Sequence, residues 1–380
     1  VGIAAAEGRL SVSDKLARFF PEYEGSITDS RMRDVSLRDL LSMTSGHAVC
    51  AIQAMQSDPD GNYVRGFLSS ALAHAPGETF CYNSGASYML AAVIRKVTGE
   101  NVREYLLPRL FSPLGIVPGI WECCPQGINF GGWGLSLTTE DIARFADLLL
   151  RNGRHDGKQL IPADYLAEAT RKQSDNSMND APDWKRGYGY QFWLSKHGFR
   201  GDGACGQYAI AIPEENLAIA ITSCLENMQD VLTILWDRLI PFLKDEPLPE
   251  NPDGNRRLLS ALSRLSLRPV EGKMKGAVPG RSFKFRPNSA GIHSCAVEIG
   301  GDECALTFRT DRGTEQLRAG FGCHRVSVFQ LTDIIPRPTA ASAAWVADSV
   351  LEVRTFCLDG TFRDTYRIDF LDPEHPVTRQ

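Results

Sequence analysis

The amino-acid sequence predicts an α+β protein of two domains. Amphipathic helical segments fill most of the first half, and a few apolar strands with one further helix follow them. A charged, proline-rich stretch then leads into a series of strand-like segments. Helices and strands in separate blocks indicate an α+β fold, because a doubly wound sheet requires their regular alternation. We expect a helical domain with an antiparallel sheet over residues 1–243, a linker over 244–256 and a small antiparallel β domain over 257–380.

Caps and apolar spacing predict the helices of the first domain. Ser36 is an N-cap candidate for a helix that ends at Gly46, and Thr138 with Asp141 resembles a capping box. The clearest helix covers residues 84–99, where Gly99 suits the C′ position. Its apolar positions recur at helical spacing and are Tyr88, Met89, Ala92, Val93 and Val97.

Turn signals predict the strands. The apolar runs at residues 207–213 and 217–223 are separated by Pro213-Glu214-Glu215-Asn216, which indicates a hairpin buried on both faces. In the second domain, Gly300-Gly301-Asp302 and Asp359-Gly360 are hairpin turn signals between alternating segments. This pattern is typical of a small barrel or sandwich.

Composition excludes several function classes. The net charge of −5 and the pI near 5.9 argue against a nucleic-acid partner, and no apolar run is long enough for a membrane span. No histidine or cysteine spacing suits a metal, and no glycine-rich nucleotide motif occurs, so we expect no metal and no cofactor. The ten cysteines lie mostly in apolar runs (Cys81, Cys224, Cys295 and Cys357) and indicate free thiols in a reducing, cytoplasmic setting.

A polar cluster stands where a strand-like segment meets the helix at residues 84–99. The segment 76–84 reads PGETFCYNS, so Tyr82, Asn83 and Ser84 occupy the junction. Polar residues at such a junction either cap the helix or act in an active site. On the structural interpretation, Ser84 is the N-cap and Tyr82 is a half-buried aromatic residue.

Several segments in order resemble the serine β-lactamase and penicillin-binding-protein-like hydrolases, which include class C β-lactamases, D-alanyl-D-alanine carboxypeptidases and related esterases. The resemblance covers residues 1 to about 243. The matching segments are GRLSVSDKLARFFPE, SLRDLLSMTSGH, PGETFCYNSGASYMLAAVIRKVTG, LPRLFSPLGI and GLSLTTEDIARFADLLLRNG. It implies a helix-and-sheet hydrolase domain that forms an acyl-enzyme with a small-molecule or peptide substrate.

The family's Tyr-x-Asn element, or a variant such as Tyr-x-Ser, matches Tyr82-Asn83-Ser84. The resemblance implies that Tyr82 is a general base or proton relay, that Ser84 orients the substrate or a lysine, and that Asn83 lies at the substrate side. A free phenol has a pKa of about 10, so Tyr82 acts near neutral pH only if a nearby cation stabilises the phenolate.

The family's Lys/His-Thr/Ser-Gly element matches Gly201-Asp202-Gly203, with the Ala204 N–H as the oxyanion donor. The family cation is absent at Gly201, although Arg200 lies beside it in the sequence. A glycine-rich turn before a strand explains this segment equally well. The missing cation weakens the case for tight recognition of a β-lactam or peptide carboxylate and favours an ester, a small amide or an unusual peptide.

The family's Ser-x-x-Lys element does not occur in the 380 residues. In the family it opens the helix whose last turns match VGIAAAEG, so we expect the serine and lysine to lie upstream of Val1. On this interpretation the chain as written does not form an acyl-enzyme. The alternative is a non-catalytic relative that binds a ligand or partner.

Overall fold

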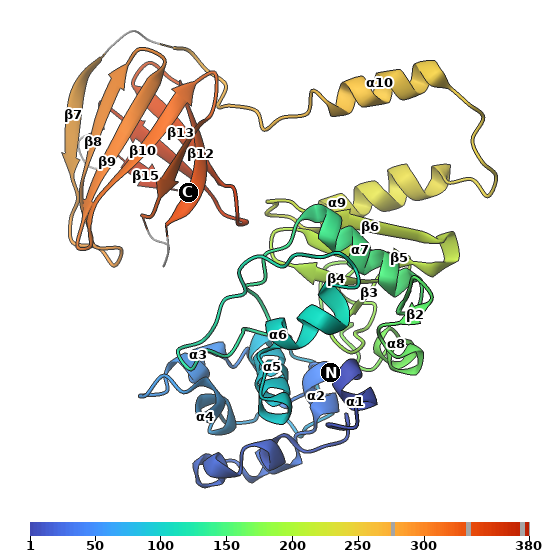
Figure 1. The fold of residues 1–380 in the computed structure, drawn as a ribbon. Helices are drawn as coiled ribbons and strands as arrows, with labels where there is room; N and C mark the ends of the chain where they lie inside the picture. The colour runs from blue at the N-terminus through green and yellow to red at the C-terminus, as the bar shows by residue number, and fades with distance from the viewer. Residues whose placement is uncertain (275–277, 332–335, 373–376, 380) are drawn as a thin grey trace. The chain divides into compact units, whose positions relative to one another are not determined.

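A computed structural model describes residues 1–274, 278–331, 336–372 and 377–379. The chain divides into two compact units, residues 1–243 and 244–380, and each is described by itself (Figure 1). The helices and antiparallel strands of the first unit and the strand series of the second confirm the predicted α+β fold.

The first unit contains nine α-helices and six short strands. The helices are α1 (Gly2–Ala6), α2 (Leu37–Leu41), α3 (Ile52–Gln56), α4 (Tyr63–Leu68), α5 (Ser84–Thr98), α6 (Val102–Leu106), α7 (Thr139–Leu150), α8 (Ala163–Ala169) and α9 (Gln229–Ile234). The strands are β1 (Arg154–His155), β2 (Lys158–Gln159), β3 (Trp193–Leu194), β4 (Phe199–Gly203), β5 (Gln207–Ile212) and β6 (Leu217–Ile221). Shorter 3₁₀ or π turns lie at Leu16–Phe19, Pro21–Ser26, Ser30–Asp34, Leu107–Phe111, Pro213–Glu215, Leu235–Leu239 and Ile240–Phe242.

Helix α5 is the central helix of this unit. Every residue from Gly85 to Ile94 is buried, so the helix is covered on all sides rather than along one stripe. It ends at Gly99, whose φ of 78° is a left-handed conformation that glycine adopts without strain. The predicted caps of two other helices are confirmed, because Ser36 and Thr138 each form a capping box with the acidic residue three positions later.

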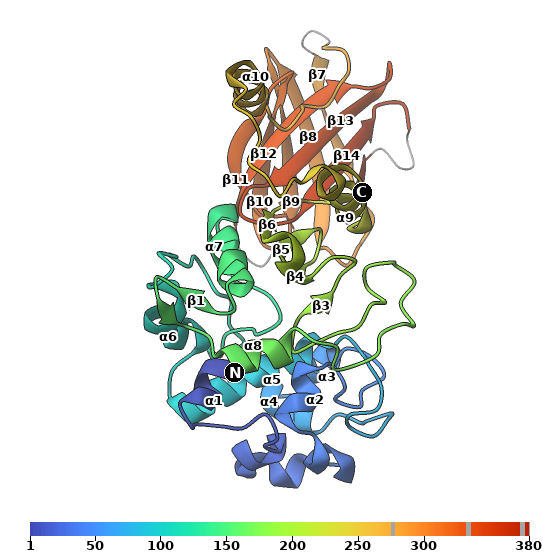
Figure 2. The ribbon, with the colours of Figure 1, turned by 90° about the vertical axis from the view of Figure 1, so that its right-hand side faces the viewer.

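Strands β3, β4, β5 and β6 form an antiparallel sheet in that order. The predicted hairpin between β5 and β6 is confirmed, with the left-handed Asn216 closing its turn. The hairpin is not buried on both faces as expected, because all residues of β6 remain half-exposed at the edge of the sheet. Helix α7 lies along β5 and β6 (Figures 1 and 2).

The described residues of the second unit form one helix and one curved sheet. Its elements are α10 (Pro252–Leu262), β7 (Val278–Lys284), β8 (Ile292–Gly300), β9 (Glu303–Thr310), β10 (Gly313–Phe321), β11 (Arg325–Phe329), β12 (Arg337–Trp345), β13 (Val350–Cys357), β14 (Arg363–Asp369) and β15 (Val377–Arg379). The described strands run in the order β15-β14-β13-β12-β10-β9-β8-β7, and β11 pairs with β12. Both predicted hairpin turns are present, between β8 and β9 and between β13 and β14.

The β unit differs from the expectation in two respects. Its sheet is not wholly antiparallel, because β10 pairs with β12 in parallel. In addition, α10 begins at Pro252, inside the segment that we expected to be a linker. Asn251 caps α10 by accepting a hydrogen bond from the Gly254 N–H, and Pro252 suits the first helical position.

Alternating side chains build the core of the β unit. Cys295 and Val297 of β8, Leu306 and Phe308 of β9 and Val353 of β13 point into it and are buried. Figures 1 and 2 show the strands of this unit wrapped around a common interior, so the sheet curves around this core. All ten cysteines of the chain carry free thiols, but among those expected to be buried only Cys295 is fully so.

Candidate active site

The N-cap of α5 is Asn83 and not Ser84, which is the first residue of the helix. The Asn83 side chain is fully buried, and its Oδ1 accepts hydrogen bonds from the backbone N–H groups of Gly85 and Ala51, each at 3.0 Å. Its Nδ2 donates to the Ser45 Oγ at 3.5 Å. These contacts show that the Asn83 side chain joins the start of α5 to the chain around residues 45–51, on the inside of the fold.

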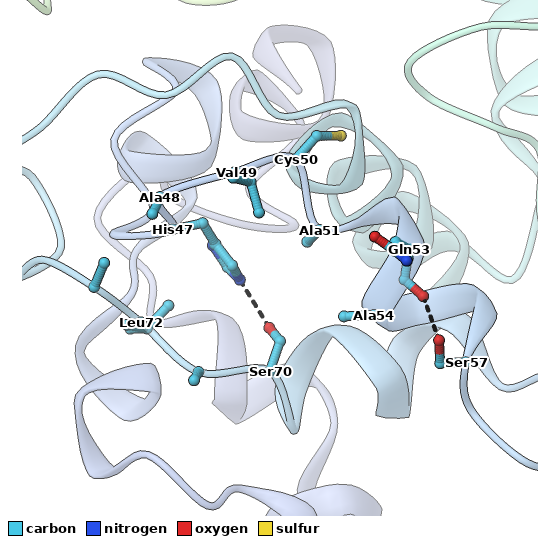
Figure 3. A pocket seen from close by; sticks show the side chains of 12 residues that line it. His47, Ala48, Val49, Cys50, Ala51, Gln53, Ala54, Ser57, Ser70 and Leu72 are labelled. Carbon is cyan, nitrogen blue, oxygen red and sulfur yellow. Dashed lines mark hydrogen bonds between the residues drawn. The ribbon is translucent and has the colours of Figure 1, made fainter.

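A buried hydrogen-bond chain continues from Ser45. The Ser45 Oγ lies 3.0 Å from His47 Nδ1, and His47 Nε2 lies 2.8 Å from the Ser70 Oγ (Figure 3). The Ser70 hydroxyl donates to the Phe67 carbonyl, so it accepts from a protonated Nε2, and Ser45 donates to Nδ1. Burial lowers the pKa of His47 to about 4, which keeps the imidazole neutral near pH 7. His47 is therefore a structural link between two serines.

A pocket of about 530 Å³ borders this chain of hydrogen bonds. Figure 3 shows that its wall is formed by the residues that lead from His47 into α3 and by those that follow α4. Most of the lining side chains are small and apolar, and they include Ala48, Ala51 and Ala54. Cys50 also lines it, beside the segment that Asn83 holds.

Tyr82 stands at the surface, immediately before the α5 cap, with 44% of the residue exposed. Its ring stacks on Trp193 of β3 with centroids 5.4 Å apart, and it meets the edge of Tyr188 at 6.3 Å. Phe80 packs against the same two rings. This cluster of Phe80, Tyr82, Tyr188 and Trp193 joins the start of α5 to the four-stranded sheet. We refer to it as the aromatic cluster.

The environment of the Tyr82 hydroxyl disfavours the phenolate. Burial is the main cause that raises the pKa of Tyr82 to about 12, although 44% of the residue is exposed. The negative charges of Asp202 and of the Cys50 thiolate raise the pKa further. Within the described residues, no cation is among the groups that shift it. Tyr82 in this chain is therefore a protonated hydrogen-bond donor.

Strand β4 separates its residues onto two faces. Arg200 and Asp202 point to the face of the aromatic cluster, while Gly201 and Gly203 lie on the other face, because successive positions of a strand alternate. A β-carbon built at Gly201 would meet no atom within 4 Å, so a side chain there would enter open space. Ala204 is exposed and follows directly after the end of the strand.

Arg200 does not replace the missing family cation at Gly201. It is completely buried, with its guanidinium 4.6 Å above the ring of Trp184. Its Nε donates to Asp202 Oδ2 at 3.0 Å, and its Nη1 donates to the Ser195 hydroxyl at 2.6 Å. A cation that is enclosed and ion-paired in this way cannot reach a substrate on the Gly201 face.

The two carboxylates near Arg200 respond differently to burial. Burial raises the pKa of Asp202 to about 6, and the charge of Arg200 opposes this rise only in part. Burial also acts to raise the pKa of Asp183, but hydrogen bonds from Gln229, the Lys196 N–H and Trp236 outweigh it and lower the pKa. The pair Arg200–Asp202 is thus a buried ion pair whose carboxylate takes up a proton at a higher pH, about 6, than a free aspartate does.

The structure brings Tyr82 and Asp202 together beside the aromatic cluster, and Asn83 next to Tyr82 is buried. It does not bring Gly201 and Gly203 to that cluster, because they lie on the opposite face of β4. Sequence reasoning missed the Arg200–Asp202 pair and the Ser45–His47–Ser70 chain. The spacing of two residues within a strand was a signal for the pair. The described residues contain no group of three or more potential metal-ligand side chains, and none of their helices is both long and apolar enough to cross a bilayer.

Comparison with known proteins identifies the first unit. A family model described as Beta-lactamase matches residues 1–233. The chain is 24% identical over 193 residues to a 6-aminohexanoate-dimer hydrolase of Paenarthrobacter ureafaciens, which covers 47% of this chain and 49% of that protein. It is 23% identical over 283 residues to penicillin-binding protein 4 of Amycolatopsis lactamdurans, which covers 64% of this chain and 73% of that protein.

A solved structure from Bacillus anthracis, named as a 6-aminohexanoate-dimer hydrolase, shares the fold with a TM-score of 0.52 and 21% identity. That match covers 62% of this chain and 67% of the other. The chain spans about half the length of the first curated relative it matches. The expected resemblance is confirmed, because the family model covers more than half of the residues. The chain belongs to the beta-lactamase family of serine hydrolases and penicillin-binding-protein-like proteins.

Proposed function

We propose that this chain supplies the tyrosine and oxyanion part of a serine hydrolase that cleaves an ester, amide or peptide through an acyl-enzyme. The observation that carries the proposal is the position of Tyr82. It is exposed, it precedes the buried central helix, and it contacts the strand pair β3–β4 through Trp193. Relatives named as hydrolases and esterases support the reaction class. The nucleophilic serine and the lysine of Ser-x-x-Lys would come from residues upstream of Val1.

The proposed reaction has two steps. The serine oxygen attacks the carbonyl carbon, the bond to the leaving group breaks, and Tyr82 relays the serine proton to the leaving oxygen or nitrogen. Water then attacks the acyl carbon, the bond from that carbon to the serine oxygen breaks, the serine oxygen receives a proton from the water, and the acid is released. The Ala204 N–H would stabilise the oxyanion in both steps. Because the pKa of Tyr82 is raised to about 12 here, an upstream lysine would have to lower it before the phenol could accept a proton.

The charge distribution favours substrates without a carboxylate. Gly201 offers no cation to such a group, and Arg200 is buried on the other face of β4 with Asp202 as its partner. A neutral ester or amide needs no counter-ion at that position. We therefore propose neutral acyl donors as the substrate class, in preference to carboxylate-bearing β-lactams or peptides.

The test uses the hydrolase extended upstream to include Ser-x-x-Lys, with an ester substrate. We expect Tyr82→Phe to lower kcat by about 10²- to 10⁴-fold, the usual contribution of a positioned proton donor or acceptor. Tyr188→Phe is the matched control, because it removes a hydroxyl from the same aromatic cluster at a buried position, and it should change kcat only a few-fold.

Two results would contradict the proposal. The first is a stable adduct of a fluorescent acylating probe on the 380-residue chain itself, since the proposal leaves this chain without a nucleophile. The second is hydrolysis in the extended protein that does not change in Tyr82→Phe. If the extended protein binds ester ligands but never turns them over, the chain is instead a non-catalytic relative that binds a ligand or partner.

A further inference from the structure

Helix α10 presents an apolar face that no part of the described chain covers. Every residue from Asn255 to Arg268 is exposed, and the helix contributes no residue to the core of the β unit. The relative exposure of its leucines is high, at 57% for Leu258, 57% for Leu259 and 51% for Leu262. These positions are spaced i, i+1 and i+4, so they form one face of the helix.

The opposite face of this helix is basic. Arg257 falls about 100° or more from each of these leucines on a helical projection. Residues 254–268 contain four arginines and no acidic residue, in a chain whose net charge is −5. Arg256 forms an exposed ion pair with Asp253, and Arg264 donates to the Ser260 carbonyl, so both side chains remain at the surface.

The apolar and basic pattern continues past the end of the helix. Leu265 and Leu267 follow with relative exposures of 75% and 54%, and Arg264 and Arg268 flank them in the sequence. If the helix were extended by one turn, Leu265 would join the leucine face and Arg264 and Arg268 would join the side of Arg257. A helix of this length is marginal in water without packing, so an apolar surface that received the leucines would favour its extension.

We propose that residues 252–268 bind to the surface of an anionic lipid membrane. The leucines would enter the boundary between headgroups and acyl chains, while Arg257, Arg264 and Arg268 would remain at the level of the phosphates. Exposed leucines on one face and arginines on the other are the pattern of helices that lie in the plane of a membrane interface. An acidic protein surface or a neutral apolar groove would match only one of the two faces.

The test measures co-sedimentation of the full 380-residue chain with vesicles of phosphatidylglycerol and phosphatidylcholine, and with vesicles of phosphatidylcholine alone. We expect binding to the anionic vesicles, weaker binding to the neutral ones, and a gain of helical circular dichroism on binding. Arg257→Gln combined with Arg264→Gln should lower the partition coefficient by about 30-fold, since each basic residue near such a surface contributes about 1 kcal/mol. Leu258→Gln combined with Leu262→Gln should abolish binding.

Matched controls separate this surface from general charge and hydrophobicity. Leu248 is 75% exposed but lies outside the helix, and Leu248→Gln should leave binding unchanged. Lys158→Gln combined with Lys185→Gln removes two exposed positive charges from the first unit and should also have little effect. The proposal is overturned if the chain does not bind anionic vesicles, or if the helix variants bind as well as the native chain. It is equally overturned if the leucine variants change only the oligomeric state measured by light scattering, because the face would then contact a second copy.

Discussion

Replacing Asn83 with alanine should destabilise the first unit by about 2–4 kcal/mol, a loss that can be estimated from its contacts. The loss of an N-cap side chain costs about 1 kcal/mol, and here the cap bond to the Gly85 N–H is 3.0 Å long. The substitution also leaves the Ala51 N–H without its acceptor, and a buried donor without a partner costs about 1–3 kcal/mol. Both Gly85 and Ala51 are buried, so water cannot replace the lost acceptor.

Urea unfolding followed by circular dichroism measures this loss as a lower midpoint at an unchanged slope. Ser84→Ala is the matched neighbour, because Ser84 is half-exposed and does not cap the helix. It should change the free energy of unfolding by less than about 1 kcal/mol. An equal effect of the two substitutions would refute the inference that Asn83 holds the fold. So would an Asn83→Ala variant with native stability and weakened substrate binding in the extended hydrolase, which would place Asn83 at the substrate instead.

Two further substitutions test the electrostatics of the site. Because burial lowers the pKa of His47 to about 4 while the unfolded imidazole titrates at about 6.5, the unfolded chain binds an extra proton at this group between these values. The contribution of His47 to stability should therefore fall by up to about 3 kcal/mol as pH falls through this window, while Asp202, whose pKa is raised to about 6, acts in the opposite direction. Urea unfolding at a series of pH values measures the difference in stability between His47→Gln and the native chain, and this difference should change through that window. A difference that does not vary with pH would contradict the assignment. Gly201→Lys should be tolerated because its side chain meets no atom, and in the extended hydrolase it should raise kcat/KM for a carboxylate-bearing ester over its neutral analogue by about tenfold or more, the value of a charge-assisted hydrogen bond. An unchanged ratio would show that the Gly201 face is not where the substrate binds.

Local signals in the sequence were sufficient for many elements of the fold. The capping boxes that begin at Ser36 and Thr138 involve residues three positions apart. Gly99 ends α5 in a left-handed conformation that depends on its own lack of a side chain and on no distant residue. The β5–β6 hairpin also depends on a turn of adjacent residues. These features could be predicted because short-range geometry determines them, without knowledge of the rest of the chain.

Features that depend on distant partners could not be predicted in the same way. Asn and Ser have nearly equal preferences for the N-cap, so the choice between Asn83 and Ser84 is decided by the Ala51 N–H, 32 residues away. The parallel pairing of β10 with β12 likewise depends on how the sheet curves. Arginine side chains usually lie at the surface, so the sequence predicts an exposed Arg200. Arg200 is buried because Trp184, Asp202 and Ser195 enclose it.

The burial of Arg200 affects the electrostatics around Tyr82. Because side chains alternate along β4, Arg200 and Asp202 both lie on the face of the aromatic cluster, where they form an ion pair. The outer face then carries two glycines and no charge. The negative charge of the Asp202 carboxylate raises the pKa of Tyr82, and no cation among the described residues lowers the pKa of Tyr82 in return. A phenol with so high a pKa stays protonated near neutral pH, so Tyr82 can accept a proton there only if a cation stabilises its phenolate, and the function proposed above assigns that part to a lysine.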